Sequence, residues 1–331
     1  MKMEKQMNWA VLGTGVIANE MAQALQKMGK RLYGVGNRTH WKAVDFAAKY
    51  GVEKVYDRME DLFADPKVDI VYLTTPHNTH IRFLREALKN GKHVLCEKSI
   101  TLNSGELEEA IGLARERGVI LAEAMTIWHM PLYRKLRALL REGAFGRVQM
   151  LQINFGSFKE YDMENRFFNR NLAGGALLDI GVYALSLARS FLDSCPDQVK
   201  SLMKQAPTGV DEQAGILLMN PEGQMAGITL SLHSRQPKRA VISCEKGYLE
   251  ISDYPRADSA VFVDAVSGRR TQIEAGRTED ALLYEMQDME AAVISGDDSA
   301  MNLSLTAEVM RLMTGLREEW GLRYPEEERE N

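Results

Sequence analysis

Two short stretches of the sequence combine acidic, basic and phenolic side chains in a way that could support chemistry. Glu97 and Lys98 directly follow the apolar run at residues 93–96, which reads as a short buried strand. An adjacent acid and base at the end of a buried strand indicates that this end faces either water or a site. Asp179 and Tyr183 lie four residues apart in a second, helical stretch, so they share one helix face. Alternatively, Lys98 is a solvated strand cap and Tyr183 a core aromatic residue with a satisfied hydroxyl.

A glycine-rich turn near the N-terminus has the spacing of a phosphate-binding loop. Gly13, Gly15 and Ala18 form a GxGxxA pattern between an apolar run and a helical pattern. The first glycine permits a tight turn, the second admits a pyrophosphate, and the alanine lets helix and strand pack closely. The helix N-terminus favours the anion. We therefore expect a dinucleotide to bind at Gly13, Thr14, Gly15, Val16 and Ile17. A strand–helix turn that merely uses glycines is the alternative.

The residue after the second predicted strand indicates which dinucleotide binds. A carboxylate at this position would favour NAD, and none is present in the sequence from Val35 to Thr39. Arg38 stands there instead, and a guanidinium can pair with a 2′-phosphate in bidentate fashion. The sequence thus favours NADP, with NAD possible, unless Arg38 only solvates the strand end.

Polar residues also follow the fourth and fifth predicted strands. In an open parallel sheet, ligands bind beyond the carboxyl ends of the strands. We therefore expect cofactor contacts from Thr75, Pro76, His77, His80, Glu97 and Lys98. The two histidines could instead be an ordinary loop and helix-start pair.

The first 125 residues alternate between short apolar runs and helical patterns that end at glycines, which predicts a doubly wound parallel sheet. The predicted strands are 9–12, 31–36, 52–56, 69–73, 93–96 and 119–122, and the predicted helices are 17–28, 41–50, 79–90 and 104–117.

The pattern changes after about residue 125. Short runs between residues 198 and 273, separated by turn residues, predict a mostly antiparallel open sheet. The fold class is therefore α/β, with a Rossmann domain over 1–124 and an α+β substrate and oligomerisation domain over 125–331. In the second domain we predict a strand at 148–155 and helices at 130–142, 175–191, 279–295 and 303–316.

Length and composition limit the classes of protein to consider. A chain of 331 residues is long enough for two domains. A net charge of −5 gives no reason to expect nucleic acid or a membrane as partner, and no run approaches the roughly 18 apolar residues of a membrane span. Three scattered cysteines form neither a disulfide framework nor a metal-ligand pattern, so we expect no metal and a cytoplasmic protein.

Taken in order along nearly the whole chain, these motifs resemble the Gfo/Idh/MocA oxidoreductases, and Tyr183 is similar to the dihydrodiol dehydrogenase and glucose–fructose oxidoreductase branch. Ser99 replaces the proline that usually follows Glu-Lys in the family. The resemblance implies that Lys98 and Tyr183 converge on a substrate hydroxyl or carbonyl, with Asp179 beside them. It implies hydride transfer between a nicotinamide and a hydroxyl-bearing carbon of a sugar, polyol or cyclic diol. Possible substrate contacts are Trp128, His129, Asn165, Arg166 and Arg170.

Two other functions are compatible with the resemblance. The superfamily includes non-catalytic dinucleotide-binding regulators and glycosidases that retain a nicotinamide cofactor.

The C-terminal sheet is expected to have one apolar and one mixed face, because Ile228, Leu230 and Leu232 alternate with polar residues. Because the predicted helices cover only one face, we expect a homo-oligomer, a dimer or tetramer, built through the other.

Overall fold

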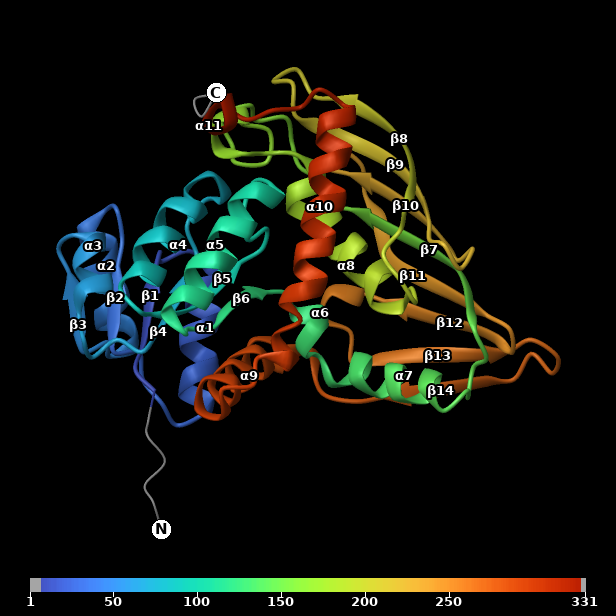
Figure 1. The fold of residues 1–331 in the computed structure, drawn as a ribbon, viewed down its shortest axis with the longest axis horizontal. Helices are drawn as coiled ribbons and strands as arrows, with labels where there is room; N and C mark the ends of the chain where they lie inside the picture. The colour runs from blue at the N-terminus through green and yellow to red at the C-terminus, as the bar shows by residue number, and fades with distance from the viewer. Residues whose placement is uncertain (1–6, 329–331) are drawn as a thin grey trace, which may run out of the picture. The chain divides into compact units, whose positions relative to one another are not determined.

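The computed structural model describes residues 7–328, and the chain forms two compact units (Figure 1). The first unit comprises the chain through Met125 together with Leu282–Leu303. The second comprises Thr126–Ala281 and the chain from Ser304 onwards. The first unit thus includes a segment from near the C-terminal end of the sequence.

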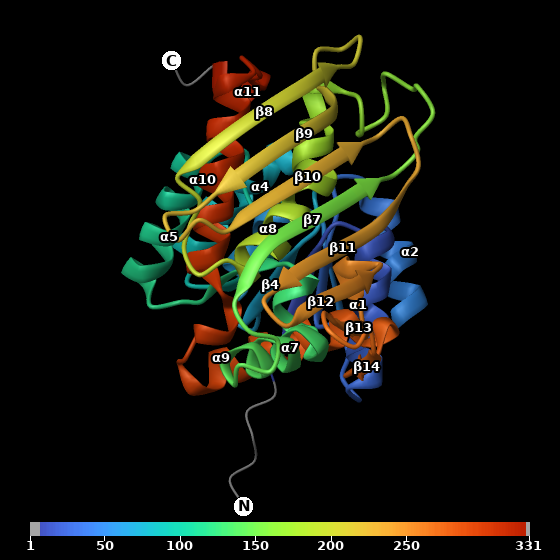
Figure 2. The same ribbon diagram turned by 90° about the vertical axis from the view of Figure 1, so that its right-hand side faces the viewer.

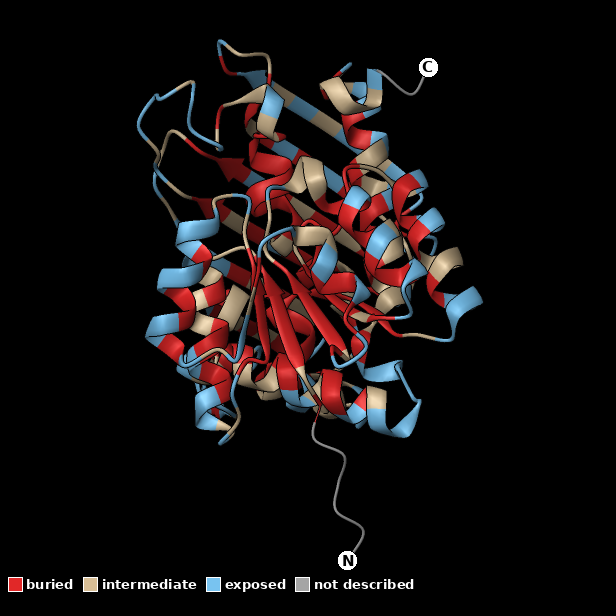
Figure 3. Ribbon diagram, turned by 90° about the vertical axis from the view of Figure 1, so that its left-hand side faces the viewer, coloured by how far each residue is buried: buried red, intermediate tan, exposed pale blue. Residues whose placement is uncertain are grey.

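A six-stranded, wholly parallel sheet forms the centre of the first unit, in the order β3-β2-β1-β4-β5-β6. The strands β1, β2, β4 and β6 are buried at every residue, as strands covered on both faces by helices must be (Figure 3). The predicted doubly wound sheet is confirmed. Its strands are β1 (Trp9–Leu12), β2 (Gly34–Gly36), β3 (Lys54–Tyr56), β4 (Ile70–Leu73), β5 (His93–Glu97) and β6 (Leu121–Ala124).

Glycines end two of the helices of this unit, as the sequence predicts. Gly51 and Gly118 adopt φ of 66° and 64°, the left-handed conformation in which a side chain is strained. At the other end of α5, the Asn103 side chain accepts a hydrogen bond from the Glu106 amide at 2.9 Å. The short helix α3 was not predicted. The helices are α1 (Val16–Lys27), α2 (His40–Tyr50), α3 (Met59–Ala64), η1 (His77–Thr79), α4 (His80–Lys89), α5 (Ser104–Arg117), α9 (Ala281–Ser295) and η6 (Ser299–Met301).

Buried polar contacts attach α9 to the start of the first unit. The indole N–H of Trp9, a fully buried residue, donates to Glu290 Oε1 at 2.9 Å. The ammonium group of Lys30 pairs with the other oxygen of the same carboxylate. These contacts explain why residues 282–303 belong to this unit.

The second unit is built on an eight-stranded sheet in the order β14-β13-β12-β11-β7-β10-β9-β8 (Figure 2). Every neighbouring pair is antiparallel except β7 and β10, which confirms the predicted mostly antiparallel sheet. The edge strand β8 was not predicted as a separate run. The strands are β7 (Val148–Gly156), β8 (Gln198–Gln205), β9 (Asp211–Met219), β10 (Met225–Ser231), β11 (Gln236–Cys244), β12 (Gly247–Ser252), β13 (Ser259–Asp264) and β14 (Arg270–Glu274).

The predicted helix at 175–191 is interrupted rather than continuous. A π-helical segment precedes a shorter α-helix, and the preceding turn is 3₁₀. By length and composition alone, the stretch Arg170–Phe191 is the one helix among residues 7–328 that could cross a membrane. However, 83% of its most apolar window is buried inside the protein, as the core helix of a domain is. The helices of this unit are α6 (Thr126–His129), α7 (Pro131–Arg141), η2 (Arg170–Leu172), η3 (Leu177–Gly181), α8 (Val182–Phe191), η4 (Tyr254–Arg256), η5 (Thr278–Asp280), α10 (Leu303–Glu319) and α11 (Pro325–Glu328).

Candidate active site

The loop between β1 and α1 has the backbone that the glycine pattern predicts. Gly13 has φ of +110°, and its amide donates to the Gly36 carbonyl at 2.8 Å. A Cβ at Gly13 would lie 2.3 Å from Thr74 Oγ1, so no larger residue fits without displacing β4's end. Only glycine gives this tight turn its conformation at no steric cost.

The same loop leaves space in front of the start of α1. A Cβ at Gly15 would meet no atom within 4 Å, and Val16 is 80% exposed. Within the described residues, no side chain caps this helix and no acid occupies its first turn. The backbone N–H groups of that turn can therefore bind an anion, and an open, glycine-lined approach fits a dinucleotide pyrophosphate.

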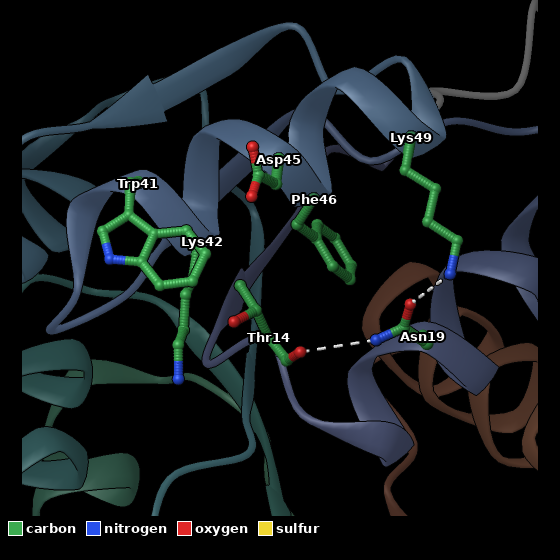
Figure 4. A pocket seen from close by; sticks show the side chains of 7 residues that line it. All are labelled: Thr14, Asn19, Trp41, Lys42, Asp45, Phe46 and Lys49. Carbon is green, nitrogen blue, oxygen red and sulfur yellow. Dashed lines mark hydrogen bonds between the residues drawn. The ribbon is translucent and has the colours of Figure 1, made fainter.

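A pocket of about 380 Å³ adjoins this loop between α1 and α2 (Figure 4). The Asn19 side chain crosses it, donating to the Thr14 carbonyl at 3.3 Å and accepting from the Lys49 ammonium at 2.9 Å. Asn37 Nδ2 donates to Thr14 Oγ1 at 2.7 Å and so ties the glycine loop to the end of β2. The pocket is lined by Thr14, Asn19, Trp41, Lys42, Asp45, Phe46 and Lys49.

Arg38 lies exposed between β2 and α2, where the sequence predicts the 2′-phosphate contact. It makes no ion pair with any of residues 7–328. Lys42, in the first turn of α2, lies over the Trp41 ring at 5.6 Å. Two cations at this helix start are therefore available to a phosphate group.

The segment that follows β5 is held in place through its backbone and through Glu97. The Tyr72 hydroxyl donates to Glu97, and the Ile100 amide donates to the buried carboxylate of Glu123 at 3.1 Å. The Lys98–Ser99 peptide bond is cis. Lys98 itself is half-buried and lies directly after the last residue of β5, Glu97.

Both histidines of the preceding loop lie within hydrogen-bond distance of this segment. His80 is fully buried, with Nε2 at 2.7 Å from the Thr75 carbonyl and Nδ1 at 3.0 Å from the Ser99 carbonyl. His80 therefore positions the two loops, and the cofactor contact expected of it stays a prediction. His77 is half-buried, and its Nε2 lies 3.0 Å from the Lys98 carbonyl. The other predicted residues of this loop, Thr75 and Pro76, keep accessible surface.

Asp179 and Tyr183 open the long apolar helix of the second unit. Asp179 lies in the π-helical segment, is 8% exposed, and pairs with the Arg166 guanidinium at 3.5 Å. Tyr183 is half-buried on α8, and its ring centroid lies 6.1 Å from that of Phe155 on β7. The buried acid is thus partly neutralised, while the phenol faces an aromatic neighbour.

A carboxyl that was not predicted anchors the start of this helix. Asp211 is fully buried, and its Oδ2 accepts a hydrogen bond from the Leu177 amide at 2.5 Å. A Cβ at Gly175, which has φ of +126°, would lie 2.1 Å from Asp211 Oδ1. Burial raises the pKa of Asp211 to about 7. A buried acid therefore approaches the Gly174-Gly175 turn closely, where only glycine leaves space for it.

The remaining predicted substrate contacts have structural roles here. Trp128 and His129 are both 0% exposed on the short helix α6, so we assign them to the core and not to a pocket wall. Arg170 binds the Arg323 carbonyl at 2.9 Å and pairs with Glu328, which fastens the C-terminal helix α11. Asn165 is exposed in a turn, where its carbonyl accepts from two later amides. Arg166, by contrast, contacts a predicted catalytic residue, Asp179.

Lys98 lies in the first unit and Tyr183 in the second, so their joint action stays a prediction.

Two neighbours of Tyr183 were not predicted from the sequence. Phe155 and Tyr254 are packed edge to face at 5.9 Å, and the wholly buried Tyr254 hydroxyl has no hydrogen-bond partner among residues 7–328. No motif marks either residue, because the pairing of distant strands and loops brings them to the helix.

Sequence and structure comparisons give consistent matches. A trans-1,2-dihydrobenzene-1,2-diol dehydrogenase from Xenopus laevis is 29% identical over 331 residues, which is 96% of this chain and 99% of the relative. The mouse protein of the same name is 32% identical over 251 residues, 74% of each chain. KijD10, a 3-ketoreductase from Actinomadura kijaniata solved with NADP and TDP-benzene, superposes with a TM-score of 0.85 at 22% identity. That match covers 95% of this chain and 98% of KijD10.

Family models match both units. Residues 7–125 match the oxidoreductase family model with an NAD-binding Rossmann fold, and residues 133–250 match the Gfo/Idh/MocA C-terminal domain. The dinucleotide loop therefore lies inside the matched Rossmann domain, and Asp179 and Tyr183 lie inside the second match. The chain belongs to the Gfo/Idh/MocA family of oxidoreductases.

Proposed function

We propose that this protein is an NADP(H)-dependent dehydrogenase or reductase that interconverts a hydroxyl-bearing carbon and a ketone. Its substrate would be a sugar, a polyol or a cyclic diol. The observation that carries the proposal is the Lys98 segment, whose backbone is fixed by buried partners at the carboxyl end of β5, where ligands of an open parallel sheet bind. The names of the dihydrodiol dehydrogenase and 3-ketoreductase relatives support the same reaction class.

Lys98 and Tyr183 have complementary parts in this proposal. During oxidation, the substrate hydroxyl gives its proton to Tyr183, and the carbon-bound hydrogen leaves as hydride. A nicotinamide, when bound, supplies the hydride acceptor or donor. An ordinary tyrosine titrates near 10, which is too high for a good base at neutral pH. An ammonium group favours the phenolate form of a tyrosine, and in this proposal Lys98 supplies that ammonium.

The preference for NADP over NAD is assigned to Arg38. Its guanidinium is exposed and has no ion-pair partner in residues 7–328. Arg38 lies two positions after Gly36, the last residue of β2. A charge-assisted hydrogen bond to a 2′-phosphate is worth about 1.5–3 kcal/mol, which corresponds to roughly 10- to 100-fold in affinity.

The test is calorimetric titration of NADP⁺ and NAD⁺ into the wild type and Arg38→Ala. We expect the wild type to bind NADP⁺ more tightly, and the variant to lose that advantage while its NAD⁺ affinity is kept. Equal affinities in the wild type would contradict the assignment. Cofactor reduction is then followed against a panel of sugars, inositols and dihydrodiols, and a complete lack of turnover would contradict the proposed reaction.

A further inference from the structure

An irregularity in the pairing of β11 with β7 changes the direction in which the side chain of Lys238 points. Where β11 pairs with β7, Gln236 lies opposite Gly156, and Arg239 lies opposite Asn154. Pro237 and Lys238 together therefore oppose the single residue Phe155. Two residues facing one define a β-bulge, a feature that re-aims side chains and is common beside functional sites.

The bulge places Lys238 on the inner face of the sheet. Further along β11, Ala240 and Ile242 lie opposite Ile153 and Leu151, and all four are fully buried. Residues directly opposite each other in an antiparallel pair share a face, so the residue opposite Phe155 belongs to this same face. Consistently, the Lys238 ammonium lies over the Phe155 ring, 5.3 Å from its centroid.

Lys238 differs from the arginine beside it in having no acidic partner. Arg239 pairs with Glu250, which also pairs with Arg270 at 2.7 Å. Lys238 makes no ion pair with any of residues 7–328. Asp179, the buried acid at the nearby helix start, pairs instead with Arg166. Arg239 thus stabilises the sheet through an ion pair, whereas Lys238 contacts an aromatic ring, that of Phe155.

The ring beneath Lys238 is also the neighbour of Tyr183. The Phe155 centroid lies 6.1 Å from that of Tyr183, so the ammonium and the phenol flank the same side chain. A molecule held at the Tyr183 hydroxyl could extend across Phe155 and reach the ammonium with a second polar group. The group that an unpaired ammonium binds best is an anion.

We propose that Lys238 binds a carboxylate or phosphate group of the substrate, so that the substrate is an acidic hydroxy compound and not a neutral polyol or diol. This inference rests on the proposed function, since it takes Tyr183 as the point where the reacting hydroxyl binds. The anion lies on the Phe155 side of that hydroxyl. Lys238 is then a specificity-determining residue, contacting substrate without taking part in proton or hydride transfer.

The experiment uses the full-length protein saturated with NADP⁺, so that the pyrophosphate loop is occupied. Binding of glucose, gluconate and glucose 6-phosphate is measured by calorimetry for the wild type, Lys238→Met, Lys238→Arg and Arg239→Met. The comparison of gluconate with glucose 6-phosphate separates a carboxylate from a phosphate. The Arg239→Met variant removes a neighbouring cation from the opposite face and serves as the matched control.

We expect the wild type to bind one of the two anions at least tenfold more tightly than glucose, and Lys238→Met to lose this preference. Lys238→Arg and Arg239→Met should retain it. Weak binding of both anions by the wild type, or an unchanged preference in Lys238→Met, would overturn the proposal. Turnover is measured in parallel: Lys238-dependent anion binding without any cofactor reduction would refute the proposed reaction while leaving the anion site in place.

Discussion

The two segments that carry the proposed catalytic groups are anchored in different ways. In the first unit, the imidazole rings of His77 and His80 lie within hydrogen-bond distance of backbone carbonyls and hold the segment containing Lys98. In the second, the helix start containing Asp179 is held by the buried carboxyl of Asp211. Burial disfavours the charged form of both kinds of group, so it lowers the pKa of His80 and raises the pKa of Asp211. The two anchors are therefore expected to respond to pH in different ways.

The largest effect is expected when the anchored side chains themselves, Lys98 and Tyr183, are replaced. Lys98→Met and Tyr183→Phe should each lower turnover by about 10²- to 10⁴-fold, the usual contribution of general acid–base catalysis. The double variant should cost little more than the worse single change, because residues that act as a unit are not additive.

Steady-state turnover and NADP⁺ titration check this prediction together. NADP⁺ affinity should change far less than turnover, since the glycine loop is untouched. Near-wild-type turnover in either single variant would show that the assignment is wrong. If only Tyr183→Phe is inactive, Asp179 becomes the partner of the phenol to examine.

The anchor of the second unit should make stability depend on pH. Burial raises the pKa of Asp211 to about 7, from 3.8 in the unfolded chain, so the folded state holds a proton that the unfolded state has released. The free energy of unfolding should therefore fall as pH rises from about 4 to about 7 and then level off, by at most about 4 kcal/mol. Asp211→Asn should flatten this part of the curve. Urea unfolding between pH 4 and pH 8 measures it, and an equal slope in both proteins would exclude Asp211 as the cause.

Removing the His80 anchor should lower the free energy of unfolding mainly because it leaves buried carbonyls without a hydrogen-bond partner. His80→Phe keeps an aromatic ring but leaves the Thr75 and Ser99 carbonyls without their partner, at about 1–3 kcal/mol for each buried group. We expect a loss of about 2–4 kcal/mol in unfolding free energy, together with a lower turnover. His77→Phe is the matched control, because the half-buried His77 should cost less than half as much. Equal losses in both variants would indicate that burial of His80 has no special importance.

The smallest effect on the folded protomer, but a large one on assembly, is expected at the outer face of the second sheet. Leu202 and Leu217, on β8 and β9, are 83% and 54% exposed, and Met150 on β7 is 38% exposed. We predict that a second copy of the chain covers this face. Leu217→Lys should leave the unfolding transition nearly unchanged and shift the protein to monomer in light scattering. A wild type that is monomeric at micromolar concentration would refute the oligomer.

Much of the fold could be predicted because its elements carry local signals. Short apolar runs, separated by helical patterns that end at glycines, predicted the parallel strands that the structure contains. The edge strand β8 was missed because none of its residues is buried and its apolar residues do not alternate regularly with polar ones. The π-helical segment was missed because its residues suit an α-helix equally well.

The candidate site was predictable only where a motif is local. The loop at Gly13 and the end of β5 could be located from spacing alone. The positioning role of His80 could not be predicted, because its two partners are backbone carbonyls, which leave no trace in the side-chain sequence. Lys238 depends on a one-residue shift in register between strands some 80 positions apart in the chain, which no local pattern records.

The contact between Trp9 and Glu290 has a consequence for the order in which the protein can be completed during translation. The ribosome delivers the whole parallel sheet early, yet α9, with Glu290, emerges only after the second unit has been almost fully synthesised. Until then the indole of Trp9 and the ammonium of Lys30 lack their shared carboxylate. A nascent first unit is therefore exposed along the surface that α9 will cover, and a fragment ending near residue 125 would keep that surface open permanently.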